Sequence, residues 1–153
     1  SYLYDHAGRL KTTKHKLNTG TEVTLANNTY DGLGRLNINQ KHTHANLKTT
    51  FNYNIRSWVK SISSPLFNQT LYYNDSYANN TKRYGGNISA MSWKIGTETL
   101  RGYRFGYDNL SRLTKAEYLV NGVVNNNYKV PSVTYDKHGN ITALERWGKT
   151  ASG

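Results

Sequence analysis

The sequence predicts an all-β fold of consecutive antiparallel hairpins, in which about six repeats form a curved or spiralling sheet strip, or partial β-shell. Three observations predict this fold class. No segment has helical periodicity, and the abundant Thr, Asn, Tyr and Gly residues favour strands and turns over helices. Tyr-Asp pairs recur with a loose period of about 26 residues, as in repeat proteins. The 13 Tyr and 3 Trp residues, with hydrophobic residues at only 36%, predict a thin, aromatic core.

The repeat is a seven-residue pattern, Tyr-Asp-x-x-small-polar-aliphatic. Four copies begin with a Tyr-Asp pair, at residues 4–10, 30–36, 107–113 and 135–141. A fifth copy, residues 53–59, carries Asn54 at its second position and Trp58 at its sixth, and a sixth keeps Gly86, Asn87 and Ile88 but has Lys82 in place of the tyrosine. The first positions of the six repeats are therefore 4, 30, 53, 82, 107 and 135.

Each repeat is predicted to form a β-hairpin. Asp or Asn at the second position can accept a hydrogen bond from the backbone N–H two residues later. Gly at the fifth position, or Ser57 and Ser111 in two repeats, takes the left-handed conformation that closes a three-residue loop with a bulge. Apolar residues two apart before the turn, such as Tyr2 and Tyr4, share one strand face, and the aliphatic seventh residue starts the return strand.

Second turns connect successive hairpins. Asn18-Thr19-Gly20 and Asn121-Gly122 are turn signals between repeats, and Gly96-Thr97 is a weaker one. Residues 63–83, which contain Pro65 and many Asn, Asp and Gln, are expected to form a longer loop or a frayed edge. Because the repeat phase resumes afterwards, residues 1–153 are predicted to be one array. Residues 1–5 lack the features of a signal peptide and the chain lacks an initiating Met, so it is interpreted as a segment of a larger protein.

The residues of the repeat signature are expected to be structural. The phased aspartates are explained by their place in the turns. Arg9, Arg35 and Arg112 share one phase and are expected to pair with the turn aspartates or with tyrosine faces. The signature set is Tyr4, Asp5, Gly8, Arg9, Leu10, Tyr30, Asp31, Gly34, Arg35, Leu36, Tyr53, Asn54, Trp58, Gly86, Asn87, Ile88, Tyr107, Asp108, Arg112, Leu113, Tyr135, Asp136, Gly139, Asn140 and Ile141.

No group of residues in the sequence is typical of an enzyme. The absence of Cys excludes disulfides, thiolate zinc sites and a thiol nucleophile, and no phosphate loop, nucleophile elbow or HExxH motif is present. His42 and His44 would lie on one strand face as half of a metal site, but no partner carboxylate is evident. His6 and His138 fall inside hairpin turns. We therefore predict no catalytic residues, no metal, no cofactor and no enzymatic activity.

The positive charge of the chain does not identify its binding partner. With 20 Lys and Arg against 9 Asp and Glu, the net charge of +11 suits nucleic acid, an anionic glycan, a membrane surface or an acidic protein. The basic residues are scattered and no nucleic-acid-binding module is present, so nucleic acid is disfavoured and solvated charge on strand faces is the simpler interpretation. No run of 18 apolar residues exists, so no membrane span is predicted. Exposed Tyr and Trp beside Asn, Thr and Arg are typical of glycan-binding surfaces, although no ligand-binding residues can be named.

The Tyr-Asp-x-x-Gly-Arg-Leu repeats resemble the YD repeats of bacterial Rhs proteins and their relatives, which are the wall-associated proteins, the insecticidal toxin-complex B and C components and the animal teneurins. Blocks between residues 51 and 118, namely 53–58, 71–74, 84–89, 93–94 and 101–108, are similar to Rhs-repeat proteins of the Bacteroidetes. The resemblance implies a sheet strip that spirals into a shell around a C-terminal toxin or effector, or into an extracellular barrel for adhesion. The parent would be a large bacterial protein that is secreted or lies at the cell surface.

The resemblance also sets the expected function and partners. We expect a non-catalytic structural segment that helps to encapsulate or present an effector in competition between bacteria or in surface contact, and a carbohydrate-binding or adhesive module is the alternative. The family's self-cleaving segment, with its Asp-Pro motif, has no counterpart, because Pro65 and Pro131 follow Ser64 and Val130. The expected partners are the effector and neighbouring repeats, with glycans as the alternative. Open sheet edges are expected to make the isolated chain self-associate.

Overall fold

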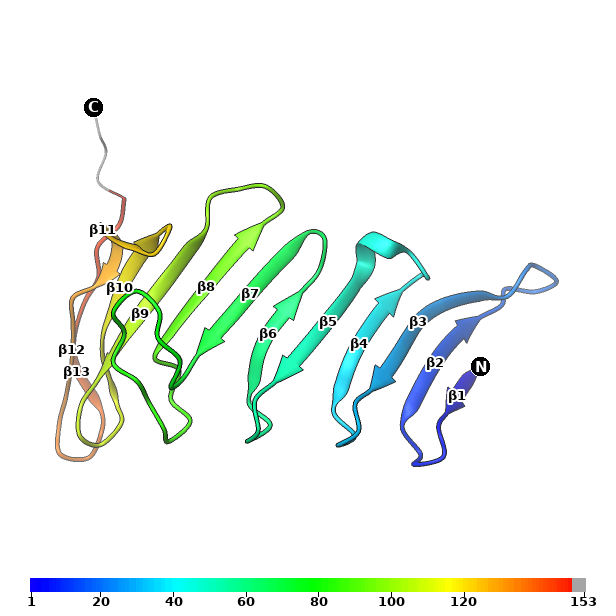
Figure 1. Cartoon of the computed structure of the whole chain (residues 1–153), viewed down its shortest axis with the longest axis horizontal. Helices are drawn as coiled ribbons and strands as arrows, with labels where there is room; N and C mark the ends of the chain where they lie inside the picture. Colours follow the sequence, from blue (N-terminus) through cyan, green and yellow to red (C-terminus); the bar gives the residue numbers. More distant parts are fainter. Residues whose placement is uncertain (150–153) are drawn as a thin grey trace. The chain divides into compact units, whose positions relative to one another are not determined.

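The computed structural model describes residues 1–149 and confirms the prediction of an all-β fold of consecutive antiparallel hairpins (Figure 1). The first eleven strands are β1 (Tyr2–Tyr4), β2 (Leu10–His15), β3 (Val23–Tyr30), β4 (Leu36–Lys41), β5 (Lys48–Tyr53), β6 (Val59–Ser63), β7 (Phe67–Tyr72), β8 (Ala90–Ile95), β9 (Arg101–Tyr107), β10 (Leu113–Val120) and β11 (Val123–Val130). They form one sheet whose strand order is the chain order. Strands β12 (Ser132–Tyr135) and β13 (Ile141–Glu145) form a separate two-stranded sheet.

Helical structure in the described part of the chain is limited to one short 3-10 helix, η1 (Ala45–Leu47), between β4 and β5. No helix within residues 1–149 is both long and apolar enough to cross a membrane. The abundance of Asn, Thr and Tyr accounts for this, because these residues favour strands and turns.

The chain divides into two compact units, Ser1–Asn68 and Gln69–Gly153, which we describe separately. The boundary lies inside residues 63–83, the stretch that was expected to be irregular. The expectation is wrong for residues 67–72, which form the paired strand β7, and the longer loop follows this strand, from residue 73 to residue 89. The single array over residues 1–153 stays a prediction, and its last four residues lie outside the described part.

The hairpin turns have the predicted chemistry. In the first turn the Asp5 Oδ1 atom accepts hydrogen bonds from the backbone N–H groups of Ala7 (2.9 Å) and Arg9 (3.0 Å), and Gly8 has a φ of +75°. The register shifts by one residue at Tyr4, which is the predicted bulge. The other turns with an aspartate repeat this pattern, and the two serines in the glycine position have φ values of 62° and 64°.

The second turns also lie where the sequence placed them. Asn121 and Gly122 have φ values of 50° and 79° and join β10 to β11 as a two-residue hairpin loop. The backbone N–H of Gly20 donates to the carbonyl of Leu17 in the turn between β2 and β3. Gly96, with a φ of 48°, lies in the turn between β8 and β9.

The first compact unit has no buried residue within Ser1–Asn68. Polar side chains join its strands: the Thr12 hydroxyl donates to the amide oxygen of Asn27 (3.2 Å), and the side-chain amide of Asn39 donates to that of Asn28 (2.7 Å). The thin core inferred from composition is confirmed most fully in this unit. Its stability must depend on strand pairing and on contacts between repeats more than on apolar burial.

The second compact unit contains the core of the described residues, which is partly aromatic. The buried residues are Tyr73, Ser89, Ala90, Ser92, Ala116, Tyr118, Leu119 and Val133, together with Gly102. Beside them the Tyr103 ring lies 5.8 Å from Trp93, 6.1 Å from Phe105 and 5.4 Å from Tyr118, measured between ring centres. The prediction of aromatic packing is therefore confirmed in this unit.

Candidate functional site

The repeat signature builds a contact between consecutive hairpins. The Arg9 Nε atom lies 2.7 Å from Asp5 Oδ2, so the arginine is ion-paired within its own turn. Its guanidinium carbon lies 4.6 Å from the centre of the Tyr30 ring in the next repeat. The Tyr30 hydroxyl then donates to the backbone carbonyl of Leu10 (2.8 Å), beside Arg9 in the sequence. We call this set of three contacts the Asp–Arg–Tyr link.

The same link joins the second and third repeats. Arg35 Nε lies 2.7 Å from Asp31 Oδ2, and its guanidinium carbon lies 4.5 Å from the centre of the Tyr53 ring. The Tyr53 hydroxyl donates to the carbonyl of Leu36 (2.8 Å). Arg35 also donates through Nη1 to the Ser57 hydroxyl (3.1 Å), so this link reaches the next turn directly.

A third copy of the link lies in the second compact unit. Arg112 Nε is 2.7 Å from Asp108 Oδ2, and the guanidinium carbon is 4.6 Å from the centre of the Tyr135 ring. The Tyr135 hydroxyl donates to the carbonyl of Leu113 (2.7 Å), and Arg112 Nη1 donates to the carbonyl of Asp136 (3.2 Å). These arginines were expected to pair with the turn aspartates or with tyrosine faces, and the structure has both contacts.

The degenerate repeat builds a similar contact with a different arginine. As in the complete links, the carbonyl at position seven accepts a hydrogen bond from the tyrosine of the next repeat: the Tyr107 hydroxyl donates to the Ile88 carbonyl (2.7 Å). The cation over the Tyr107 ring comes from Arg83, whose guanidinium carbon lies 5.0 Å from the ring centre. Asn87, at the sixth position, donates instead to the carbonyl of Ser111 (3.2 Å). Lys82 lies inside the 73–89 loop and not at the end of a strand.

The remaining two repeats vary at the sixth position. In the third repeat Asn54 Oδ1 accepts from the backbone N–H groups of Arg56 (2.9 Å) and Trp58 (3.1 Å), and Arg56 lies 5.2 Å from the centre of the Trp58 ring. In the last repeat Asn140 Nδ2 donates to Asp136 Oδ2 (2.8 Å). Position six is thus always polar or aromatic, but only arginine there makes the complete link.

The signature residues of each repeat lie together at its turn, and the links join adjacent repeats within each compact unit. The glycines and serines of position five lie in the left-handed turn position, at Gly8, Gly34, Ser57, Gly86, Ser111 and Gly139. No described group of three His, Cys, Asp or Glu side chains is arranged to hold a metal ion. The fold and the links together define a β-hairpin repeat protein.

The turn carboxylates have pKa values below the ordinary 3.8, at Asp5, Asp31, Asp108 and Asp136. At Asp5 the largest cause is the hydrogen bond from the backbone N–H of Arg9, followed by a smaller desolvation effect in the opposite direction. At Asp31 desolvation is the largest influence and raises the pKa, but the backbone and side-chain hydrogen bonds from Arg35 outweigh it. The charged form of each turn aspartate is therefore favoured in the folded protein.

Acid is expected to weaken the fold through these aspartates. A carboxylate whose pKa is lowered by folding stabilises the native state above its unfolded pKa, so this contribution is complete above pH 3.8 and is lost as the pH falls below that value. Urea unfolding followed by circular dichroism at pH 7, 5 and 3 should give similar midpoints at the first two values and a lower one at pH 3. The variant Asp31→Asn with Asp108→Asn should show a smaller drop, and an unchanged midpoint at pH 3 in the unsubstituted chain would contradict the prediction.

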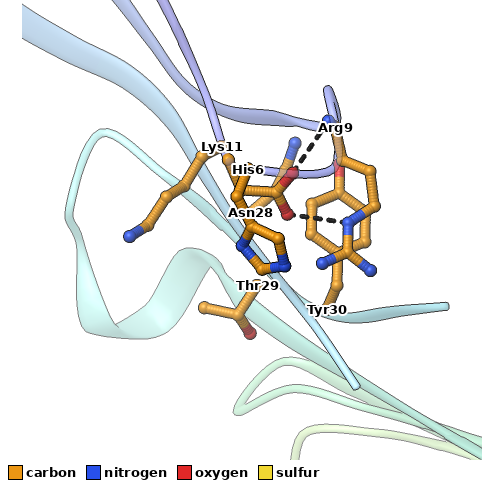
Figure 2. Close-up of a pocket in the computed structure, with 7 residues that line it drawn as sticks. His6, Arg9, Lys11, Asn28, Thr29 and Tyr30 are labelled. Atoms are coloured by element: carbon orange, nitrogen blue, oxygen red, sulfur yellow. Dashed lines mark hydrogen bonds and ion pairs between the residues drawn. The ribbon is translucent and has the colours of Figure 1, made fainter. Parts of the chain in front are cut away.

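A shallow hollow of about 310 Å³ lies beside the first link, in the first compact unit (Figure 2). Its lining consists of Asp5, His6, Arg9, Lys11, Asn28, Thr29 and Tyr30. Several lining groups already bond within the protein: Asp5 with Arg9, and Asn28 and Tyr30 with the carbonyl of Leu10. The link therefore forms part of the wall of this hollow.

The prediction that His42 and His44 share a strand face is wrong. Both follow the end of β4, and His42 and Thr43 have φ values of 49° and 53°, so the chain turns there. His44 caps η1 instead, because its Nδ1 atom accepts a hydrogen bond from the backbone N–H of Asn46 (3.2 Å). Left-handed backbone at two consecutive residues ends the strand alternation on which the prediction depended.

Sequence reasoning missed the contacts that hold the 73–89 loop. Arg104 Nε donates to Glu117 (2.8 Å), and its Nη1 atom donates to the carbonyl of Ala78 (2.7 Å) in the loop. The Tyr72 and Tyr77 rings stack at 4.3 Å with an angle of 5° between their planes. Arg104 and Glu117 are cross-strand partners in β9 and β10, so only the register of the strands could have paired them.

Comparisons with known proteins give little beyond this description. No protein-family model matches the chain, and no curated protein matches it. Among solved structures, the crystal structure of TcdB2-TccC3-Cdc42 is similar over 94% of this chain, at 16% sequence identity and a TM-score of 0.46. The matched region is 9% of that much longer chain. None of these findings concerns the Bacteroidetes, a cell wall or carbohydrate binding.

Proposed function

We propose that the chain is a non-catalytic structural segment of a large secreted or cell-surface protein of the Rhs type. In this proposal its repeats form part of a β-shell that encloses or presents a C-terminal toxin or effector, in competition between bacteria or in surface contact. The observation that carries the proposal is the Asp–Arg–Tyr link, which recurs with the same three contacts at Arg9, Arg35 and Arg112. A contact that recurs between consecutive hairpins is what a continuous wall built from repeats would use.

The link is also the reason why we assign no catalytic role to these polar residues. Each aspartate is held by its turn and its arginine, and each arginine lies over a tyrosine whose hydroxyl is already bonded to a carbonyl. A general acid, a base or a nucleophile needs a group that can reach a substrate, and these groups are engaged with one another. Because these residues are bonded to one another, we assign the repeat signature a structural role.

The partners that follow from this proposal are the neighbouring repeats and the effector of the longer protein. The test uses that longer protein, with Arg35→Ala and Arg112→Ala together removing one link from each compact unit. We expect the enclosed C-terminal part to become sensitive to limited proteolysis, because the wall opens where the links are lost. Lys48→Ala with Lys137→Ala, two exposed lysines, is the matched control and should leave the digestion pattern unchanged.

Two outcomes would contradict the proposal. One is an unchanged digestion pattern in the double arginine variant whose links have been removed. The other is saturable binding of a soluble glycan that persists at high salt, because a wall segment needs no such ligand and nonspecific ionic attraction is screened under those conditions. The second outcome would favour the carbohydrate-binding alternative.

A further inference from the structure

The 73–89 loop begins and ends at the same point of the second compact unit. The backbone N–H of Ser89 donates to the carbonyl of Tyr72 (2.8 Å), and the N–H of Arg83 donates to the carbonyl of Tyr73 (2.7 Å). The loop therefore leaves the end of β7 and returns to it before β8 starts at Ala90. A loop whose ends are neighbours is a compact unit whose residues can move together while the rest of the fold stays closed.

The tip of the loop has an unfavourable backbone. Ala78 and Asn79 have φ values of 49° and 55°, in the left-handed region. A Cβ atom crowds the following carbonyl oxygen there, and alanine has no polar side chain that can compensate locally. The Asn80 side chain supports the adjacent turn, because its Oδ1 atom accepts a hydrogen bond from the backbone N–H of Tyr77 (2.9 Å). The closed loop is thus strained at its tip, and other contacts must offset that strain.

Two buried side-chain atoms of the loop have no hydrogen-bond partner in the described part of the chain. One is Arg83 Nε, although the same guanidinium donates through Nη2 to the carbonyl of Tyr107 (3.4 Å). The other is the hydroxyl of Tyr77, which lies near Ser92 without a hydrogen bond to it. A buried polar atom without a partner loses the hydrogen bonds that it makes in water, so both atoms favour an open loop.

Arg104, on β9, connects the tip of the loop to the sheet. Its Nη1 atom donates to the carbonyls of Ala78 (2.7 Å) and Asn79 (3.4 Å), which are the two left-handed residues. Its Nε atom donates to Glu117 Oε2 on β10 (2.8 Å), and the Arg104 and Glu117 side chains are only 21% and 24% exposed. Charge-assisted hydrogen bonds are about twice as strong as neutral ones, so this oriented guanidinium can hold a strained tip.

We infer that the 73–89 loop is a lid with a closed and an open state, and that the Arg104–Glu117 pair is its catch. Strain at the tip and the two unpaired buried atoms favour opening, whereas the bonds of Arg104 favour closure. Because these contributions oppose one another, the open state is a minor but accessible population. This inference goes beyond the proposed function, which does not require the loop to move.

Opening changes the surface of the second compact unit. In the closed state the Tyr77 ring covers Tyr72, with 4.3 Å between ring centres, and the Arg83 guanidinium carbon lies 5.0 Å from the centre of the Tyr107 ring. Tyr72 and Tyr107 belong to β7 and β9, which stay paired when the loop moves. An open lid therefore uncovers two aromatic faces and removes the arginine from the degenerate repeat's junction.

Hydrogen exchange of the whole chain, followed by mass spectrometry, tests the lid. Peptides from residues 73–89 should exchange faster than peptides from β9 and β10, because the loop opens without unfolding of the sheet. Arg104→Ala removes the catch and should speed exchange of the 73–89 peptides at least about ten-fold, with a smaller change in β10. Equal acceleration of the loop and β10 peptides would mean a general loss of stability and would overturn the inference, as would unchanged exchange of the loop.

Arg101→Ala is the matched control on the same strand. Arg101 Nη2 lies 3.2 Å from Glu98 Oε2, so this substitution also removes an arginine and an ion pair from β9. Glu98 lies in the turn between β8 and β9 and not in the 73–89 loop. Exchange of the 73–89 peptides should therefore match that of the unsubstituted chain. Acceleration as large as in Arg104→Ala would contradict a specific catch.

Ala78→Gly tests the strain at the tip from the opposite direction. Glycine adopts left-handed backbone without steric cost, so the closed state should become more stable. Exchange of the 73–89 peptides should be about three-fold slower, after allowance for the greater freedom that glycine gives to the open loop. Faster exchange in this variant would contradict the role of the strained tip. None of these failures would affect the proteolysis result for the longer protein, so the lid and the proposed function can be judged separately.

Discussion

Replacing Leu119 by alanine is expected to lower the free energy of unfolding of the second compact unit by about 2–5 kcal/mol, the usual cost of truncating a buried leucine. Leu119 lies in β10 with 0% of its surface exposed and is the largest fully buried hydrophobic side chain in the described part of the chain. It pairs with Gly102 on one side and with Val124 on the other. Because so few apolar residues are buried, the remaining core has little capacity to compensate.

Urea unfolding followed by tryptophan fluorescence measures this change, since Trp93 lies on β8 of the same compact unit. Leu110→Ala is the matched control: it removes the same atoms from a turn residue that is 72% exposed, and should change the free energy by less than about 0.5 kcal/mol. Equal effects of the two substitutions would show that the core does not depend on Leu119.

The parts of the fold that the sequence predicted are those encoded within a few residues. The turn of Asp5 and Gly8 needs only a carboxylate, a backbone that reverses, and a residue that accepts a positive φ, all within four positions. Such chemistry is visible without knowledge of the tertiary structure. It also sets the phase of the array, and hence the two contacts of Arg9, Arg35 and Arg112.

The parts that could not be predicted depend on contacts distant in the sequence. Arg83 lies over Tyr107 although it is not at the sixth position of its repeat, because the 73–89 loop brings it back beside the hairpin. The bond from Arg83 N–H to the Tyr73 carbonyl (2.7 Å) fixes that return. Arg104 likewise meets Glu117 only through the β9–β10 register. Spacing along the chain contains neither the loop path nor the register.

The links give four of the 20 basic residues a structural place, although they do not explain the net charge of +11. Four arginines lie over tyrosine rings at the junctions between repeats, at Arg9, Arg35, Arg83 and Arg112. Three of them are neutralised by an aspartate of their own turn. An arginine is suited to this place because its planar group can pair with a carboxylate and lie flat on a ring at the same time. The basic residues at these positions therefore serve the junctions and need no acidic partner outside the chain.

The lysines, in contrast, do not take the cation's place in an Asp–Arg–Tyr link. Lys14 pairs with Glu22 (3.0 Å), and Lys129 lies 3.7 Å from the centre of the Trp147 ring. Lys11 lines the hollow beside the first link. These three lysines are spread over both compact units.

Substituting Gly102 by alanine is expected to destabilise the second compact unit by about 1–3 kcal/mol, in the range found for overpacked cores. Gly102 is buried in β9, and a Cβ atom there would lie 2.6 Å from the backbone carbonyl oxygen of Met91 and 3.5 Å from Leu119 Cδ1. The closest atom belongs to the backbone of the paired strand β8, which cannot move without disturbing the sheet. Thermal and urea unfolding of the purified variant measure the loss.

Gly106→Ala, in the same strand, is the matched control. Its Cβ would lie 2.6 Å from Lys115 Cγ, which moves only if the lysine changes its first side-chain torsion, but its three nearest neighbours are all atoms of that side chain and none is backbone. Alanine also restricts the unfolded chain more than glycine does, so this variant should lose less stability than Gly102→Ala. The two substitutions add the same methyl group to one strand and differ in whether backbone or side chain must yield. Equal stability of the two variants would mean that β8 can shift at Met91, and that the close pairing of β8 and β9 does not limit which side chains this part of the sheet accepts.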